Sequence, residues 1–218
     1  MLENKQKKEI VVIGSGGHAS SVIDIIQQLS EWSIYGVVSV DLEKSESFQG
    51  FKVLGDDTVF GELINNQYAF VIGVGQILSS LTRVKIFNQL LELKATLPVI
   101  ISPDAYIAKN AIFGIGTMIF HRVVVNANVQ IGKNCIINNM SLIEHDTIIG
   151  SHTHISTGAI VNGYVRIGEH CFIGSGSVIA NNTRICNKVI IGAGSVVTSD
   201  INEPGVYYGN PARKKSNE

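Results

Sequence analysis

The sequence has no surplus of charge of either sign. Its 17 Lys and Arg residues are balanced by 18 Asp and Glu residues, which gives a formal net charge of −1 with histidine neutral. Domains that bind nucleic acid or an anionic membrane surface usually carry a basic patch or stripe. We therefore expect neither nucleic acid nor a membrane among the partners of this chain.

Long apolar runs are missing as well. The run behind the basic opening segment covers only Ile10 to Ile13, which is too short for the core of a secretory signal peptide. No stretch approaches the length of about 20 apolar residues that a membrane-spanning helix needs. The chain is accordingly expected in the cytoplasm.

Cysteine is scarce, and its spacing excludes two kinds of structural site. The three cysteines are Cys135, Cys171 and Cys186, an odd number without a Cys-x-x-Cys pair. This pattern predicts neither a disulfide framework nor a zinc knuckle. His152 and His154 lie two positions apart, but no third ligand follows in register with them, so no metal site is predicted. His152 is interpreted as a solvated turn residue.

What the sequence has instead is a repeat of six residues between Ile101 and Asn202. Glycine often follows the large residue of the repeat, and a small or β-branched residue comes four places after it. A fixed period of this length indicates an architecture rather than a local motif. Every hexad carries a large aliphatic or aromatic residue, through Ile107, Phe113, Ile119, Val125, Ile131, Ile137, Ile143, Ile149, Ile155, Val161, Ile167, Ile173, Ile179, Ile185, Ile191 and Val197.

A period of six fits neither an amphipathic helix nor an alternating hairpin sheet. It fits a short strand and a turn repeated around a three-walled prism, with the large residues inside and glycine giving the tight corners their backbone freedom. Three hexads make one coil, so residues 18 positions apart should stack. Outward apolar residues such as Val124 and Ile148 would offer strips for partner prisms, which predicts a homotrimer.

The first hundred residues predict a separate α/β unit of small Rossmann-like βαβαβ type. A glycine-rich loop joins its first strand to its first helix. The expected elements are a strand over Glu9–Ile13, a helix from about Ala19 to Leu29, a strand over Tyr35–Val40, a strand over Ala69–Val74 and a helix from about Ser79 to Leu93. A ligand crevice is expected at the carboxyl ends of the strands.

The loop Gly14-Ser15-Gly16-Gly17-His18 suits phosphate, because glycines allow close backbone approach and helix N-terminal amides attract anions. Gly14, Gly16 and Ala19 also match a dinucleotide fingerprint. Only one mononucleotide-binding half fits before the prism, however, so we favour the diphosphate of a nucleotide-sugar over NAD. A merely structural glycine turn is the alternative.

The most polar hexad of the repeat contains Glu144, His145 and Asp146. A histidine beside a carboxylate can be held in one tautomer and act as a base. Eighteen positions later stands Gly163, so His145 should face an open notch in which a thioester and an amine could meet. The alternative is an exposed polar turn residue without a catalytic role.

The glycine loop, the uninterrupted hexads, the Glu-His-Asp sequence and the closing segment from Gly205 to Arg213 together resemble one branch of the hexapeptide-repeat acyltransferases. This branch comprises bacterial N-acetyltransferases of nucleotide-linked 4-amino-4,6-dideoxysugars and the related sialic acid O-acetyltransferases. The resemblance implies a nucleotide-sugar-binding domain over residues 1–98, a left-handed parallel β-helix with a C-terminal cap over residues 99–218, and a homotrimer.

The resemblance also implies roles for single residues. His145 matches the general base, Asp146 its acidic partner, and Asn138 an active-site asparagine. Acetyl-CoA would be the co-substrate, and the residues matched to its site are His154, Gly163 and Ala193. Gly16, Gly17 and His18 match a diphosphate and sugar loop, and Asp41 the position that holds the nucleoside. Arg83 is a candidate for a family arginine ligand, but the segment after Gly73 is longer than the usual Gly-Asn spacing to that arginine, so its role stays open.

Transfer of acetyl to the amine of a nucleotide-sugar is thus the first functional hypothesis, in the biosynthesis of bacterial surface glycans such as lipopolysaccharide. The second keeps the fold and the donor but acetylates a hydroxyl, for example on sialic acid. The third is a catalytically silent scaffold that senses a nucleotide-sugar and has no need of His145.

Overall fold

The computed structural model describes residues 7–44 and 46–215. The chain forms two compact units. The first comprises residues 1–75 and 81–103, and the second comprises residues 76–80 and 104–218. Gln76 to Ser80, which the sequence assigns to the α/β region, therefore belongs to the unit that contains the hexads.

The first unit is built on a five-stranded sheet in the order β3-β4-β2-β1-β5. The strands β1, β2, β4 and β5 run parallel, and β3 forms an antiparallel pair with β4. The elements are β1 (Lys8–Ile13), α1 (Gly17–Gln28), β2 (Trp32–Val38), β3 (Ser47–Phe48), β4 (Phe51–Gly55), η1 (Asp57–Val59), α2 (Phe60–Asn65), β5 (Ala69–Ile72) and α3 (Leu81–Glu92).

The core of this unit lies around the central strand β1, whose residues Ile10, Val11 and Val12 have no exposed surface. Phe60 and Phe70 meet edge to face with ring centroids 5.8 Å apart. Since β2 and β5 flank β1 on opposite sides, the chain direction across the sheet switches at β1. A ligand crevice belongs outside the carboxyl ends of strands at such a switch point, where the glycine loop lies.

The predicted order of three strands and two long helices is confirmed, but the bounds differ and the hairpin β3–β4 and helix α2 were not predicted. The second strand ends at Val38 rather than Val40, because the Asp41 amide donates to Ser39 Oγ and closes a local turn there. Val40 is 72% exposed. The third strand ends at Ile72 rather than Val74.

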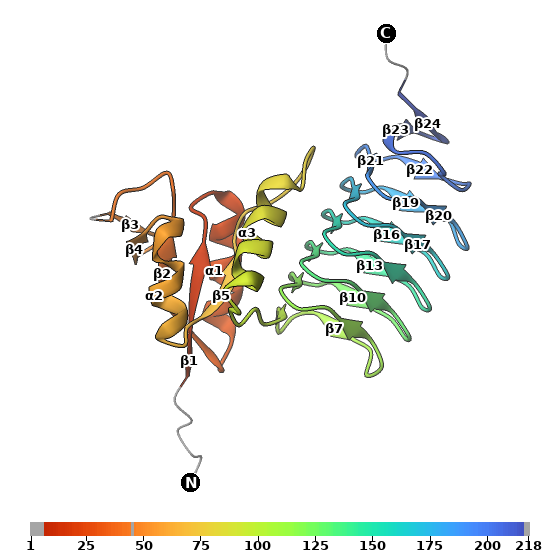
Figure 1. Cartoon of the computed structure of the whole chain (residues 1–218). Coiled ribbons are helices and arrows are strands. Elements are labelled where there is room, and N and C mark those ends of the chain that lie inside the picture. The colour runs from red at the N-terminus through yellow and green to blue at the C-terminus, as the bar shows by residue number, and fades with distance from the viewer. Residues whose placement is uncertain (1–6, 45, 216–218) are drawn as a thin grey trace. The chain divides into compact units, whose positions relative to one another are not determined.

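The second unit is a parallel β-helix whose coils stack from β7 to β22 (Figure 1). Each coil contributes one short strand to each of three sheets. Strand β6 (Ile100–Ile101) falls within residues 81–103, which are counted with the first unit. The strands of the second unit are β7 (Tyr106–Ile107), β8 (Ile112–Phe113), β9 (Met118–Ile119), β10 (Val124–Val125), β11 (Gln130–Ile131), β12 (Ile136–Ile137), β13 (Leu142–Ile143), β14 (Ile148–Ile149), β15 (His154–Ile155), β16 (Ile160–Val161), β17 (Arg166–Ile167), β18 (Phe172–Ile173), β19 (Val178–Ile179), β20 (Arg184–Ile185), β21 (Val189–Ile191) and β22 (Val196–Val197).

The predicted stacking interval is confirmed by the strand register. Val124 pairs with Tyr106 on one side and with Leu142 on the other, each 18 positions away. The large residues of the hexads fill the interior, as Ile137 and Ile143 do without any exposed surface. Three turns join the sheets in every coil, and we call them corners A, B and C. Corner A includes His145, corner B Asn138 to Ser141, and corner C Gly150 to Thr153.

The glycines that follow the large residues have a different role from the one expected. Gly114, Gly150 and Gly174 do not have positive φ angles. A Cβ atom on them would lie 2.5–2.6 Å from backbone atoms of the next coil, so close approach between coils requires glycine there. Positive φ angles occur later in the turns, at Asn128 and Asp146 among others.

The last coil is followed by β23 (Gly205–Gly209) and β24 (Ala212–Lys214). Strand β23 pairs parallel with β21, and β24 turns back antiparallel onto β23. The closing segment singled out in the sequence thus adds two strands to one sheet of the β-helix. None of the helices in the described ranges is both long and apolar enough to span a membrane.

Candidate active site

The pair His145 and Asp146 forms the turn at corner A that follows β13. The His145 Nδ1 atom lies 2.9 Å from Asp146 Oδ2. The pKa of the Asp146 carboxyl is lowered, chiefly by the hydrogen bond to His145 and next by one to Asn128. An ionised carboxylate only accepts hydrogen bonds, so Nδ1 carries the hydrogen and Nε2 keeps a lone pair. With 49% of its side chain exposed, His145 can accept a proton through Nε2.

Gly163 lies one coil above His145, as the sequence predicted, but the space between them is not open. A Cβ atom at Gly163 would lie 2.8 Å from both Cε1 and Nε2 of His145. The imidazole itself therefore occupies the volume that the missing side chain leaves. The next residue holds the same turn, since the Tyr164 amide donates to the His145 carbonyl over 3.0 Å. The expected notch is thus filled by the His145 ring, which packs directly against Gly163.

Asn138 and His154 form a second group on the sheet that contains β12 and β15. Asn138 Nδ2 lies 3.4 Å from His154 Nε2, and His154 Nδ1 lies 2.7 Å from the carbonyl oxygen of Gln76. A carbonyl only accepts, so His154 donates through Nδ1 and accepts from the Asn138 amide at Nε2. The His154 side chain is buried, and this pairing fixes its tautomer.

One chain does not bring all the predicted residues together. His145, Asp146 and Gly163 lie at corner A, between the sheets of β13 and β14. Asn138 and Ala193 lie at corner B, in turns that follow strands of the sheet to which His154 belongs. The predicted set thus divides into two groups on different corners of the β-helix.

The segment from Gln76 to Ser80 was not predicted as part of the site. Gln76 Nε2 donates to the His152 carbonyl over 2.7 Å, and Ser80 Oγ lies 3.1 Å from His170 Nδ1. The segment is thereby fastened along corner C next to His154. The one sequence signal that could have revealed it is its departure in length from the family pattern after Gly73.

His152 is not the solvated turn residue that was expected. Its ring stacks on His170 with centroids 5.0 Å apart, and its Nδ1 lies 3.1 Å from Asn134 Nδ2. It is half-buried because three coils place aligned polar side chains at the same corner. Among residues 7–44 and 46–215, no group of three His, Cys, Asp or Glu residues is placed to hold a metal ion.

The glycine loop joins β1 to α1 at the switch point of the first unit's sheet. Gly14 has a φ of +107°, and a Cβ on it would lie 3.2 Å from Val74. Gly16 and Gly17 have no atoms near the position of a Cβ, so the start of α1 is open. Gly16 is the N-cap without a side-chain cap, and no acidic residue lies in the first turn. Such a helix N-terminus is suited to bind an anion.

The loop is supported from the neighbouring strand. Ser15 Oγ and Ser39 Oγ are 2.7 Å apart, and Ser39 Oγ also accepts from the Asp41 amide over 3.1 Å. Next to it lies a pocket of about 410 Å³, lined among others by Leu42 and Asp56. Asp41 itself is exposed. This pocket could not be predicted from the sequence, because its second wall comes from the unpredicted β4–η1 region.

Arg83 is a structural residue of the first unit. Its side chain is 1% exposed, and Nη1 donates to the carbonyls of Ile72 and Val74 over 2.6 and 2.8 Å. It therefore fastens the end of β5 to α3. His18, predicted as a loop ligand, is half-buried and packs near the position of a Gly75 Cβ.

Comparisons with known proteins identify the family. A model described as the PglD N-terminal domain matches residues 9–90, and one for the bacterial transferase hexapeptide with six repeats matches residues 164–199. The acetyltransferase domain of PglB from Neisseria gonorrhoeae FA1090, solved with acetyl coenzyme A, is 30% identical with a TM-score of 0.88. The match covers 96% of this chain and 100% of that one. The chain is a PglD-like hexapeptide-repeat acetyltransferase.

Two further solved structures agree with this membership. Perosamine N-acetyltransferase from Caulobacter crescentus, solved as a variant with CoA and GDP-perosamine, is 27% identical, with a TM-score of 0.89 over 96% of this chain and 97% of that one. WeeI from Acinetobacter baumannii AYE is 26% identical, with a TM-score of 0.82 over 96% and 100%. No curated protein sequence matches significantly. The predicted family and the left-handed parallel β-helix are confirmed.

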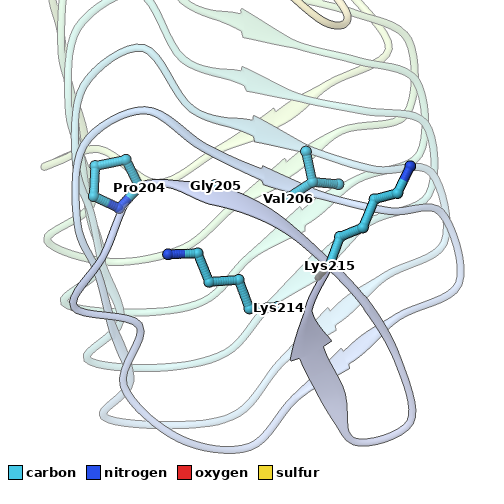
Figure 2. A pocket seen from close by; sticks show the side chains of 5 residues that line it. All are labelled: Pro204, Gly205, Val206, Lys214 and Lys215. Carbon is cyan, nitrogen blue, oxygen red and sulfur yellow. The ribbon is translucent and has the colours of Figure 1, made fainter. Parts of the chain in front are cut away.

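A pocket of about 430 Å³ lies at the C-terminal cap of the acetyltransferase, between β23 and the end of β24. Figure 2 shows Lys214 and Lys215 lining it from one side and Pro204, Gly205 and Val206 from the other. Lys214 Nζ is 2.7 Å from Glu203 Oε2, and this hydrogen bond raises the Lys214 pKa. The charge of Lys214 is thus balanced by a carboxylate, and Lys215 is the other basic residue that lines the pocket.

Proposed function

We propose that the protein transfers an acetyl group from acetyl-CoA to the amine of a nucleotide-linked 4-amino-4,6-dideoxysugar. The observation that carries this function is the His145–Asp146 pair, seated on Gly163 with Nε2 available as a base. The structurally similar PglB domain was solved with acetyl coenzyme A, and the perosamine N-acetyltransferase with CoA and GDP-perosamine. Acetyl-CoA is accordingly the co-substrate, and the activity is that of an N-acetyltransferase.

In the proposed reaction the sugar amine attacks the thioester carbonyl, so a C–N bond forms and the C–S bond breaks. His145 Nε2 takes the excess proton from the nitrogen and returns it to the leaving thiolate of CoA. Asp146 holds the ring and stabilises the imidazolium while it exists. Backbone amides near the carbonyl oxygen would stabilise its developing negative charge.

The cysteines support direct transfer without an acyl-enzyme. Burial raises the pKa of the Cys171 thiol to about 11, which leaves almost no thiolate near neutral pH. Cys135 has no exposed surface. Cys186 lies at corner C, whereas His145 lies at corner A. None of the three combines a reactive thiolate with a position beside the base.

The acceptor would be held by the first unit. We assign its diphosphate to Gly16, Gly17 and the first turn of α1, and its sugar to the vicinity of His18. Asp41 would contact the nucleoside at the edge of the neighbouring 410 Å³ pocket. This division of labour between residues 1–98 and 99–218 is part of the proposal. So are a place in surface-glycan biosynthesis and a cytoplasmic location, where acetyl-CoA is available.

The two acceptor classes are separated by an assay of acetyl-CoA consumption across nucleotide amino-sugars and sialic acids. We expect turnover of an amine at least about 100-fold above any hydroxyl acceptor, a difference of roughly 2.7 kcal/mol in barrier. Faster turnover of a hydroxyl acceptor would establish the O-acetyltransferase instead. Nucleotide-sugar binding without any turnover would leave the sensing scaffold.

We further propose a homotrimer whose active sites lie between protomers. This arrangement is supported by the division of the predicted residues between corner A and the sheet of β12 and β15, because a second copy can bring its Asn138 and His154 to the first copy's His145. Outward Val124 and Ile148 are half-buried in the single chain and would pack against the neighbour.

Complementation tests this assembly. His145→Ala and Asn138→Ala should each be inactive alone, whereas trimers of both chains mixed in equal amounts should recover about one quarter of the parental activity. With random mixing, about half of the chains carry an intact His145 and the other half an intact Asn138. About one quarter of the interfaces then combine His145 from one chain with Asn138 from its neighbour. Activity would be measured after co-expression, with light scattering to confirm the trimer. Mixed trimers without activity would place both residues in a site within one chain.

A further inference from the structure

Corner A carries a line of polar side chains, of which the proposed reaction so far uses only Asp146. Asn110, Asn128 and Asp146 occupy equivalent positions in three successive coils, 18 residues apart. Asn128 Nδ2 donates to Asp146 Oδ1 over 3.0 Å. The other carboxylate oxygen, Oδ2, is the one that faces His145. The two oxygens therefore have separate partners, and the orientation of the carboxylate is fixed by both.

Asn128 is itself held in place. Its side-chain Oδ1 accepts a hydrogen bond from the Asn110 side chain. Its backbone amide donates to Asn110 Oδ1 over 3.2 Å. Its φ of 62° lies in the left-handed region, which asparagine adopts more readily than most residues. The backbone and the side chain of Asn128 are thus both constrained, so its amide group reaches Asp146 in one geometry.

Tyr164 lies one coil above Asp146 and packs against its partner, His145. It contributes least to the lowered pKa of the Asp146 carboxyl, after His145 and Asn128. Its ring also meets the His145 ring edge to face, with centroids 5.3 Å apart and an angle of 88°. Asp146 and His145 are thereby held from both neighbouring coils.

We infer that Asn128, assisted by Tyr164, is a positioning residue for the catalytic pair: it orients Asp146 so that Oδ2 holds the His145 ring with Nε2 toward the reactants. This inference rests on the proposed function, because it gives Asn128 a role only if His145 acts as the base. The catalytic pair of His145 and Asp146 would then be supported by a line of hydrogen bonds that crosses three coils.

The test removes the Asn128 side chain without straining its backbone. Asn128→Gly is suitable because glycine adopts the left-handed region freely. We expect kcat to fall about 2- to 10-fold, the range that corresponds to the loss of one hydrogen bond. The acidic limb of the pH–rate profile should move to lower pH, because a carboxylate that is poorly oriented favours the protonated imidazole less. Asp146→Asn should move it in the same direction and further.

The chain offers a chemically matched control two positions away on the same two coils. Asn126 Nδ2 donates to Glu144 Oε2 over 2.9 Å, which is the same kind of contact between coils. Asn126→Ala removes that hydrogen bond without touching Asp146, so it should leave kcat and the acidic limb unchanged. Tyr164→Phe keeps the ring contact with His145 and should give a smaller shift of the limb than Asn128→Gly.

A double-mutant cycle decides whether Asn128 acts through Asp146. In an Asp146→Gly background, Asn128→Gly should cause no further loss of kcat. The same fold-loss in both backgrounds, or a lower kcat with an unmoved acidic limb, would overturn the positioning role. Titration of the His145 ring by NMR needs no turnover and should show the same shift. If the parental protein acetylates no nucleotide amino-sugar, the proposed function fails. If His145→Ala lowers the rate and Asn128→Gly does not, the inference alone fails.

Discussion

Replacement of His145 by alanine is expected to reduce kcat by about 10² to 10⁴, the usual contribution of a general base. The reason is local. His145 Nε2 is the acceptor left by the contact between Nδ1 and Asp146, and half of the side chain is exposed. Binding of the nucleotide-sugar should change little, because its glycine loop lies in the other unit of the chain. Rate and binding are measured separately by acetyl-CoA consumption and by titration calorimetry.

His170→Ala provides a control of the same residue type. His170 is a half-buried turn histidine at corner C that stacks on His152 rather than facing a carboxylate. Its loss should leave kcat within a small factor of the parental value. A His145→Ala enzyme that acetylates the amino-sugar at the parental rate would refute the base assignment and leave positioning of the reactants as the source of catalysis.

The β-helix could be predicted almost completely from the sequence because its period determines its geometry. The large residue of each hexad, such as Ile143, points into the interior and is buried. The interval of 18 residues is enough to predict that Gly163 stacks on His145. Periodicity reports on repeated environments. It predicts equally well which residues lie inside and which stack at the corners.

Features that break the repeat, or arise from contacts between distant segments, were not predictable. The attachment of Gln76 to His152 and His154 depends on a segment outside the hexads. Arg83 is charged, and nothing in its sequence context signals that two backbone carbonyls at the end of β5 bind it in the core. In both cases the side chain binds a backbone carbonyl. Every residue has such a carbonyl, so the sequence does not indicate which one is bound.

The glycines show a similar limit. Sequence reasoning attributes glycine to tight corners, yet Gly150 lies where a Cβ would be 2.6 Å from the backbone of the next coil. Gly163 is needed for a third reason: a Cβ atom at this position would collide with the imidazole ring of His145. The residue type is the same in each case, and only the three-dimensional neighbours distinguish the reasons.

This distinction between glycines yields the second large effect. Gly163→Leu should lower kcat to nearly the level of His145→Ala, roughly 10²-fold, by displacing the base from its seat. A Cβ at this position meets only side-chain atoms of the His145 ring and no backbone, and Gly163 does not have a positive φ angle, so the fold should persist. Gly150→Ala is the contrasting variant. Its Cβ meets backbone, so it should lose about 1 to 3 kcal/mol of stability.

Thermal unfolding and kinetics together separate these outcomes. Gly163→Leu should unfold close to the parental temperature with a low kcat, whereas Gly150→Ala should unfold at a lower temperature. Two explanations of a slow Gly163→Leu enzyme then differ in their binding of acetyl-CoA. If the new side chain displaces His145, affinity stays near the parental value, and adding His145→Ala causes no further loss of rate. If it blocks the acetyl site instead, affinity falls and the two substitutions add. An unchanged rate in Gly163→Leu would show that the contact with Gly163 does not hold the imidazole in its working position.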